Sequence, residues 1–283
     1  MKVVSEKRMR LKGARVYLSG PMDFVHDREL EAKFGWRTRV DRFLSKMKVT
    51  VLDPWEKPEV RGFHEYGKEK DGDQEKIKRL WTYEQGPAGQ EARAWCAARF
   101  WETHHIDLRM VDIADFVIAY CPTTIYSVGT VNEIVVARLQ YKPVLLVTPH
   151  IPITEVERLR KHLKDDERGR RLLADLERKV PIKPNPRAIP SLWYMPLVGG
   201  HNFFDGFGFA EFRSQFGWEE GPLDKNEKSE PPDRPLLPFL RDLNRGKKSQ
   251  KFNIDLRKSE DDDNWLIWEL GQKPDSRVKK NSR

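Results

Sequence analysis

The fold is indicated most clearly by residues 106–148, IDLRMVDIADFVIAYCPTTIYSVGTVNEIVVARLQYKPVLLVT. This stretch contains two short apolar runs, Phe116–Tyr120 and Pro143–Val147, with the length and β-branched content of buried parallel strands. A loop and a helical pattern separate the two runs, so the stretch predicts a strand-helix-strand unit. In open α/β sheets, ligands bind at the carboxyl ends of the strands, where a loop and a helix N-terminus offer free N–H groups. The same stretch therefore predicts where a binding site lies.

Two more strands and a long helix are expected before this unit. Ala14–Ser19 predicts the first strand, which runs into the turn Gly20-Pro21-Met22-Asp23, and Val49–Leu52 predicts the second. Between them, residues 26–47 have helical spacing, and the expected buried side comprises Leu30, Phe34, Trp36, Val40, Phe43, Leu44 and Met47. Leu192–Met195 is a possible edge strand. Together these patterns predict a doubly wound, flavodoxin- or Rossmann-like α/β fold, with a parallel sheet of about five strands and helices on both faces.

The sequence divides into three parts. Residues 1–150 are expected to form the α/β domain, 151–218 a helical and Gly/Phe-rich extension packed on it, and 219–283 a linker with a mostly flexible tail. An insertion at about 54–86 is charged and aromatic, and its aromatic residues favour an ordered lid. Outside these segments, Gln90–Ile113 predicts a helix, and Thr154–Lys179 predicts one or two surface helices.

Composition sets limits on the function. The 283 residues include 52 basic and 44 acidic ones, with a net charge of +8, which permits an anionic ligand without requiring one. The charge is diffuse and no nucleic-acid-binding motif is present, so we expect no nucleic-acid partner. Two cysteines provide neither a disulfide framework nor a metal quartet. No apolar run approaches the roughly 18–20 residues of a membrane span, and the first residues lack an apolar leader, so we expect a cytoplasmic protein.

Two carboxylates in the stretch, Asp107 and Glu133, are expected to reach one crevice. A carboxylate pair that flanks a glycosidic bond can carry out retaining chemistry, in which one carboxylate attacks the anomeric carbon. Stabilisation of the helix dipole by Glu133 near the helix start is the alternative, and from the spacing alone it is the simpler explanation.

Three motifs resemble those of the nucleoside 2-deoxyribosyltransferase superfamily, which includes the 2'-deoxynucleoside 5'-phosphate N-hydrolases. The motifs are Tyr17-Leu18-Ser19-Gly20-Pro21, Asp107 with Asp115, and Gly129-Thr130-Val131-Asn132-Glu133. The resemblance covers about residues 14–53 and 100–148, and it leaves out the insertion and everything after about residue 150. Each motif is short, but their order and their placement at successive strand ends make the set moderately specific.

The resemblance implies a role for each matching residue. Glu133 would be the nucleophile that attacks C1' of the sugar, Asp107 would hold the sugar or assist proton transfer, and Tyr17 would orient the nucleophile. Gly129 would allow the backbone to approach the substrate closely. The other residues expected at the substrate are Ser19, Gly20, Pro21, Asp23, Ser127 and Thr130. The resemblance implies no metal or organic cofactor, a nucleoside or nucleotide as the small-molecule partner, and a homo-oligomer of two or more subunits.

One position distinguishes between subgroups of this superfamily. The transferases that act on free nucleosides tend to carry Asp six residues before the nucleophile, where this chain has Ser127. Serine there is similar to the nucleotide N-hydrolases, in which a hydroxyl beside helix N–H groups binds the 5'-phosphate. A neutral donor at a helix N-terminus suits a phosphate dianion, whereas an aspartate would repel it. Ser127 and Thr130 therefore favour a (deoxy)nucleoside 5'-monophosphate and hydrolysis.

Three alternatives stay open. Ser127 can be an ordinary turn residue. The reaction can be deoxyribosyl transfer between bases rather than hydrolysis. The chain can also be a non-catalytic nucleotide-binding or sensor module, whose insertion and tail contact a partner.

Overall fold

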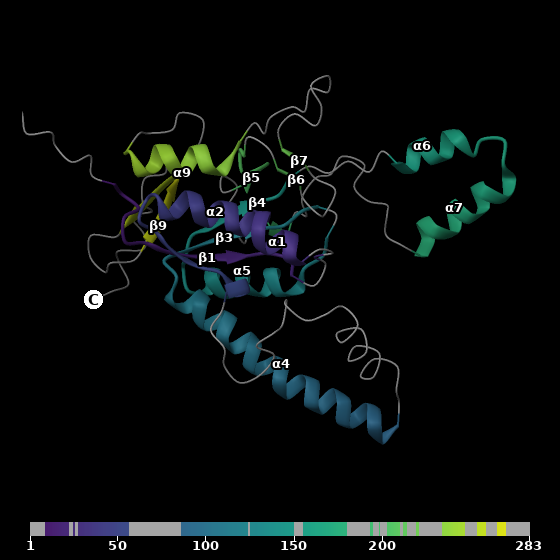
Figure 1. Cartoon of the computed structure of the whole chain (residues 1–283), viewed down its shortest axis with the longest axis horizontal. Helices are drawn as coiled ribbons and strands as arrows, with labels where there is room; N and C mark the ends of the chain where they lie inside the picture. The colour runs from purple at the N-terminus through teal and green to yellow at the C-terminus, as the bar shows by residue number, and fades with distance from the viewer. Residues whose placement is uncertain are drawn as a thin grey trace, which may run out of the picture.

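A parallel five-stranded sheet forms the centre of the computed structural model (Figure 1). Its strands are β1 (Arg15–Ser19), β2 (Thr50–Leu52), β3 (Phe116–Tyr120), β4 (Val144–Val147) and β5 (Phe203–Phe204). The structure describes residues 9–22, 25, 28–56, 86–123, 125–149, 155–179, 193–194, 198, 203–209, 212–213, 219–220, 234–246, 254–258 and 265–269.

The strand order is β2-β1-β3-β4-β5. The chain therefore moves outward from β1 to β2 and then crosses back to place β3 on the other side of β1, with Ser19 opposite Ala119. This is the flavodoxin-like order, and its direction reverses between β1 and β3, where open α/β sheets form their ligand crevice. The prediction of a doubly wound α/β fold with a parallel sheet is confirmed.

Helices cover both faces of the sheet (Figure 1). One face packs against α2 (Trp36–Ser45) and α9 (Leu236–Asn244), and the other against α4 (Pro87–Ile113) and α5 (Val128–Leu139). Helix α1 (Arg28–Phe34) contacts α2. Side chains along a strand alternate between the faces. In β1, Val16 and Leu18 are therefore buried toward α2, whereas Tyr17 is buried with residues of α5.

The helix expected over residues 26–47 is two helices that meet at Gly35. Gly35 is extended, with a ψ of 171°, so the chain changes direction there. Only α2 presents its apolar side to the sheet, through Trp36, Val40 and Leu44. The prediction that Leu30 and Phe34 are buried is wrong, because α1 lies on the other side of the break and leaves them 48% and 55% exposed.

The break at Gly35 leads to a stability prediction. A Cβ at this position would lie 2.3 Å from Cδ of Glu31 and 2.4 Å from the Glu31 carbonyl oxygen. We expect Gly35→Ala to lower the free energy of unfolding by about 1–3 kcal/mol, because either the side chain or the helix end must shift. Gly129→Ala is the control for urea denaturation, since a Cβ there meets nothing within 4 Å. Equal stability of the two variants would contradict the explanation.

The edge strand expected at Leu192–Met195 is wrong. Two residues of that segment are described. Trp193 lies in a turn and is 82% exposed, and Tyr194 has a helical conformation. The fifth strand is instead Phe203–Phe204, which pairs with Leu146 and Val147 of β4. It lies in the Gly/Phe-rich segment 199–218, where Phe204 and Phe207 are buried in the core.

Helix α9 lies inside residues 219–283, which the sequence suggested to be a linker with a mostly flexible tail. Its apolar side is buried in the same core as α2, through Leu236, Leu237, Phe239, Leu240 and Leu243. At its end, the Asn244 side chain accepts a hydrogen bond from the Leu11 N–H at 3.0 Å. For residues 236–244 the linker prediction is therefore wrong, while the division of the chain into domains stays a prediction.

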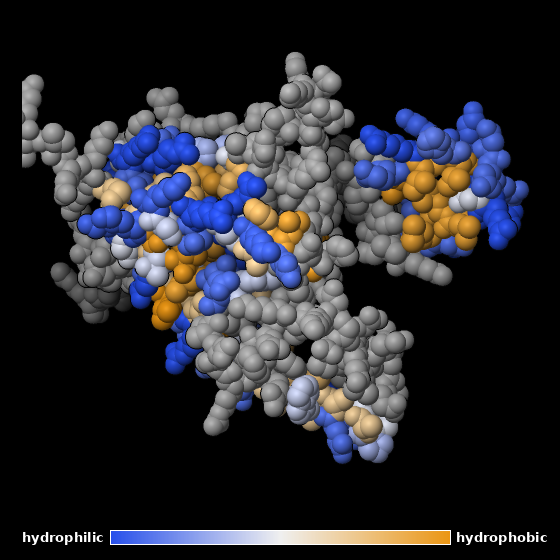
Figure 2. Space-filling view, in the orientation of Figure 1, coloured by the Kyte–Doolittle hydropathy of each residue, from blue (hydrophilic) through white to orange (hydrophobic). Residues whose placement is uncertain are grey.

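The remaining elements are peripheral. Helices α6 (Glu155–His162) and α7 (Glu167–Lys179) confirm the two surface helices, and an ion pair joins Arg160 to Glu177. Figure 2 shows apolar surface on this pair, where the partly exposed side chains are Leu159, Leu172 and Leu176. No helix of the described residues is long and apolar enough to cross a membrane.

The insertion begins with a short 3-10 helix, η1 (Pro54–Glu56), and its remainder at 57–85 lies outside the described residues. Two small antiparallel pairs complete the structure. They are β6 (Phe212–Arg213) with β7 (Glu219–Glu220), and β8 (Ile254–Lys258) with β9 (Trp265–Glu269).

Candidate active site

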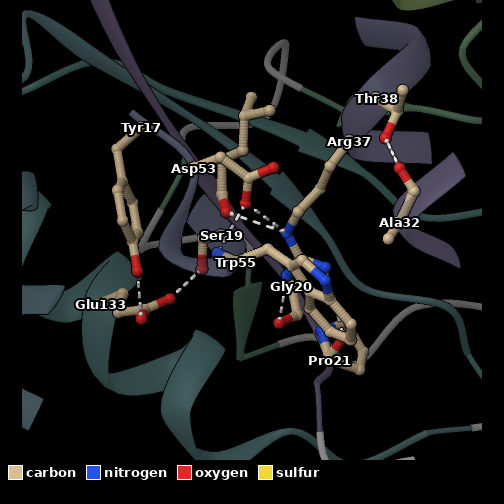
Figure 3. A network of polar contacts seen from close by, with 11 residues as sticks. Tyr17, Ser19, Gly20, Pro21, Ala32, Arg37, Thr38, Asp53, Trp55 and Glu133 are labelled. Atoms are coloured by element: carbon tan, nitrogen blue, oxygen red, sulfur yellow. Dashed lines mark hydrogen bonds and ion pairs between the residues drawn. The ribbon is translucent and has the colours of Figure 1, made fainter. Parts of the chain in front are cut away.

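A carboxylate on α5 meets two hydroxyls from β1 at the carboxyl end of the sheet (Figure 3). Tyr17 and Ser19 are two positions apart on the strand, so both side chains point to the face that α5 covers. The Tyr17 hydroxyl donates a hydrogen bond to Oε1 of Glu133 at 2.6 Å. The Ser19 hydroxyl donates to Oε2 of the same carboxylate. The structure therefore brings three of the predicted site residues together, at the point where the strand order reverses.

The protonation of Glu133 is shifted toward neutral pH. Burial raises the pKa of its carboxyl from 4.5 to about 7, and the negative charge of Asp107 adds to this rise. The hydrogen bonds from Ser19 and Tyr17, and the positive charge of Arg37, pull the pKa down but do not offset the burial. Burial and the charge of Glu133 also raise the pKa of Tyr17 well above 10, so its hydroxyl stays a donor at neutral pH.

The two aspartates of the predicted motif occupy different places. Asp107 lies on α4, and its charge acts on both Glu133 and Tyr17, which places it in electrostatic range of the cluster. Asp115 directly precedes β3, at the amino ends of the strands, whereas Glu133 lies at their carboxyl ends. The Asp115 carboxylate accepts a hydrogen bond from the Arg15 N–H at 2.7 Å and forms an ion pair with the Arg15 guanidinium. The structure thus assigns Asp115 a structural contact away from Glu133.

Arg37 of α2 donates hydrogen bonds to the turn after β1. The sequence did not single out this residue. The guanidinium is buried, and Nη2 donates to the Gly20 carbonyl at 2.7 Å (Figure 3). Weaker contacts at 3.5 Å reach the carbonyls of Leu18 and Pro21, and Nε lies 3.6 Å from Asp53. The sequence feature that could have pointed to Arg37 is its ion-pair partner Asp53, a carboxylate directly after β2.

Gly20 and Pro21 lie in this turn as predicted. A Cβ at Gly20 would lie 2.7 Å from Cζ2 of Trp36, so the close packing of the turn on α2 requires glycine. Asp23, the other substrate-contact residue expected in this segment, lies outside the described residues.

The loop into α5 ends in a helix cap. The Ser127 hydroxyl accepts a hydrogen bond from the Thr130 N–H at 3.4 Å and lies 2.8 Å from the Thr130 hydroxyl. Ser127 is therefore the N-cap residue of α5, which gives it a local structural role. Gly129 is exposed, with open space where its Cβ would be. Binding of a ligand by this loop stays a prediction.

A cavity of about 530 Å³ lies beside β2, and Arg37, which lines it, also donates a hydrogen bond to the turn after β1. The wall is acidic. Its charged and aromatic lining includes Glu31, Arg37, Asp41, Asp53, Trp55 and Glu56. Burial raises the pKa of the carboxyls of Glu31 and Asp53, although the Arg37 charge opposes this. Cys121, after β3, is also buried, and its pKa rises to about 12, so it is a neutral thiol at pH 7.

Comparison with known proteins adds only weak structural similarity. No protein-family model matches the chain. No curated protein sequence matches it either. Among solved structures, it is similar to a 2-deoxyribosyltransferase from Bacillus psychrosaccharolyticus, with 20% sequence identity and a TM-score of 0.28. The similarity covers 48% of this chain and 73% of that one. The function is therefore inferred from the geometry of the site.

Proposed function

We propose that the chain is an N-glycosidase that cleaves the base–sugar bond of a (deoxy)nucleoside 5'-monophosphate. The observation that carries the proposal is the carboxylate of Glu133, held through both oxygens by Tyr17 and Ser19 at the carboxyl edge between β1 and β3. A carboxylate fixed in this way is oriented for attack on a sugar carbon, and burial leaves it poorly solvated.

The reaction then takes two steps. A Glu133 oxygen forms a bond to C1' as the C1'–N bond breaks, and the bonding electron pair leaves with the base, which takes up a proton. Water next attacks C1' and releases Glu133, giving free base and sugar phosphate. Asp107 holds the sugar or assists the proton transfer. Only the ionised carboxylate attacks, so kcat/KM rises with pH through the Glu133 pKa of about 7.

The N-terminus of α5 supports a phosphate as the other end of the substrate. Ser127 precedes Glu133 by six positions, which is about 9 Å along a helix axis at 1.5 Å per residue. The first N–H groups of a helix have no acceptor within it and favour an anion. The open space at Gly129 leaves room for an anionic group beside the Ser127 and Thr130 hydroxyls.

The proposal is tested by a chromatographic assay for base release. Nucleosides and their 5'-monophosphates are incubated with the protein, with and without a second base as acceptor. Release from monophosphates alone supports the proposal. Exchange onto the added base would instead show deoxyribosyl transfer, and saturable binding without release would show a nucleotide-binding module.

Ser127→Asp tests the phosphate end separately. Aspartate is a good N-cap residue, so the helix start is retained, but its charge faces the expected phosphate dianion. We expect the KM for a monophosphate to rise about tenfold or more, with a much smaller change for the matching nucleoside. Ser127→Asn is the matched control, because asparagine has nearly the same size and caps as well without a charge. The same KM in both variants would place the phosphate elsewhere.

A further inference from the structure

The two hydroxyls that hold Glu133 differ in how easily each can leave it. Tyr17 is completely buried, and its ring is part of the core between the sheet and the helices α4 and α5. Its hydroxyl position is therefore fixed by packing. Ser19 is also buried, but a rotation about χ1 alone redirects its short hydroxyl. One oxygen of Glu133 therefore has a fixed donor, and the other has a donor that can turn away.

This difference matters for the chemistry. Both oxygens of Glu133 accept a hydrogen bond in this structure. Each carboxylate oxygen has two lone pairs, but a hydrogen bond draws electron density away from the oxygen that accepts it. The oxygen that attacks C1' is therefore the better nucleophile once its donor has left. Moving the Tyr17 hydroxyl would disturb the packed core, whereas moving the Ser19 hydroxyl would not.

We propose that Ser19 is a positioning residue, which holds Oε2 of Glu133 in the resting enzyme and releases it for attack. Tyr17 keeps its hydrogen bond to Oε1 throughout. The new bond forms between Oε2 and C1' while the electron pair of the C1'–N bond leaves with the base. The sequence suggested that Ser19 contacts substrate, and the geometry assigns it to the nucleophile instead. This inference rests on the proposed function.

The charges around Glu133 determine what removal of each donor does. The groups that face it are Tyr17 and Ser19 from β1, Asp107 from α4, Arg37 from α2 and the neutral thiol of Cys121 after β3. Loss of either hydroxyl removes a contact that stabilises the ionised carboxylate, so the pKa of Glu133 rises in both variants. The variants differ only in the transition state, where Tyr17 still donates and Ser19 has already left.

Profiles of kcat/KM against pH for Ser19→Ala and Tyr17→Phe test the inference. In Ser19→Ala we expect the acid limb to move to higher pH by about half a unit or more, with a loss of about threefold or more near pH 6 that shrinks steadily toward pH 9. In Tyr17→Phe we expect a loss that persists across the whole range. Ser19→Thr keeps the hydroxyl and should restore the limb, with thermal melting as the check on folding. A Ser19→Ala loss that stays constant with pH, or an unmoved limb, would overturn the inference.

A second measurement needs no turnover and separates this inference from the proposed function. The Glu133 carboxyl is titrated by ¹³C NMR in protein labelled at glutamate, and the Glu133→Gln spectrum assigns the signal. We expect a higher midpoint in Ser19→Ala than in the wild type. An unchanged midpoint overturns the role of Ser19 even if base is released. A raised midpoint in a protein that releases no base from any substrate would overturn the proposed function, and the release step with it.

Discussion

Glu133→Gln should lower kcat for base release by at least about 1,000-fold while the protein stays folded. The amide has nearly the shape of the carboxyl group and can still accept the Tyr17 hydrogen bond, so the packing of α5 on β1 is retained. It has no charge and does not form the covalent bond to C1'. Single-turnover assays on a reactive monophosphate measure the effect. Glu29→Gln is the control, because Glu29 lies on the exposed side of α1.

The same variant should change how stability depends on pH. The pKa of Glu133 is about 7 in the folded protein, against 4.5 as its ordinary value. The stability that comes from the protonated group is therefore fully present below pH 4.5 and is lost as the pH rises through 7. The displacement corresponds to about 3 kcal/mol. From pH 4.5 to 8, urea denaturation should show Glu133→Gln gaining on the wild type by about this amount. A constant difference between the two would mean that the carboxyl is not buried as described.

Arg37→Met should lower the free energy of unfolding by about 3–5 kcal/mol, which is the largest stability effect that we expect. The buried guanidinium donates hydrogen bonds to carbonyl oxygens of the turn after β1 and pairs with Asp53. Its removal therefore leaves the buried Asp53 carboxylate without this positive charge. The turn also sets the position of Ser19, so base release should fall together with stability. Urea denaturation at pH 7 measures the first effect.

A double variant isolates the cause of that effect. Asp53→Asn in the Arg37→Met background removes the stranded charge and should recover part of the loss. Arg42→Met is the control, because Arg42 lies on the exposed side of the same helix. If the Arg42 variant were as unstable as the Arg37 variant, the buried contacts of Arg37 could not be the reason.

Strands β1, β3 and β4 were predictable from the sequence because each is a short apolar run that is almost wholly buried between the two helical layers. Residues 116–120 were located without error, and the other three of the first four strands to within one residue. The edge strand and α9 were missed for a different reason. Phe203–Phe204 is two residues long, and α9 lies in a stretch rich in proline and charge. Both are held by contacts to elements far away in the chain, which a local pattern does not contain.

The candidate site was predictable in part. The proximity of Tyr17 and Glu133 was implied by the resemblance, and the structure shows the hydrogen bond between them. That Ser19 faces Glu133 follows from the alternation along β1, since residues 17 and 19 share a face. The sequence does not say what that face meets. Arg37 had no signal of its own, because it follows Trp36 on a helix whose apolar side is complete without it.

The contact between the Asn244 side chain and the Leu11 N–H joins residues 233 positions apart. Helix α9 covers one side of the sheet core, so that core remains open until α9 has been synthesised. During translation, the part of this core that α9 covers therefore stays exposed to water until residues 236–244 have been added. Apolar surface that stays uncovered for so long invites aggregation. We therefore expect the newly made chain to need protection of this apolar surface until α9 has been synthesised.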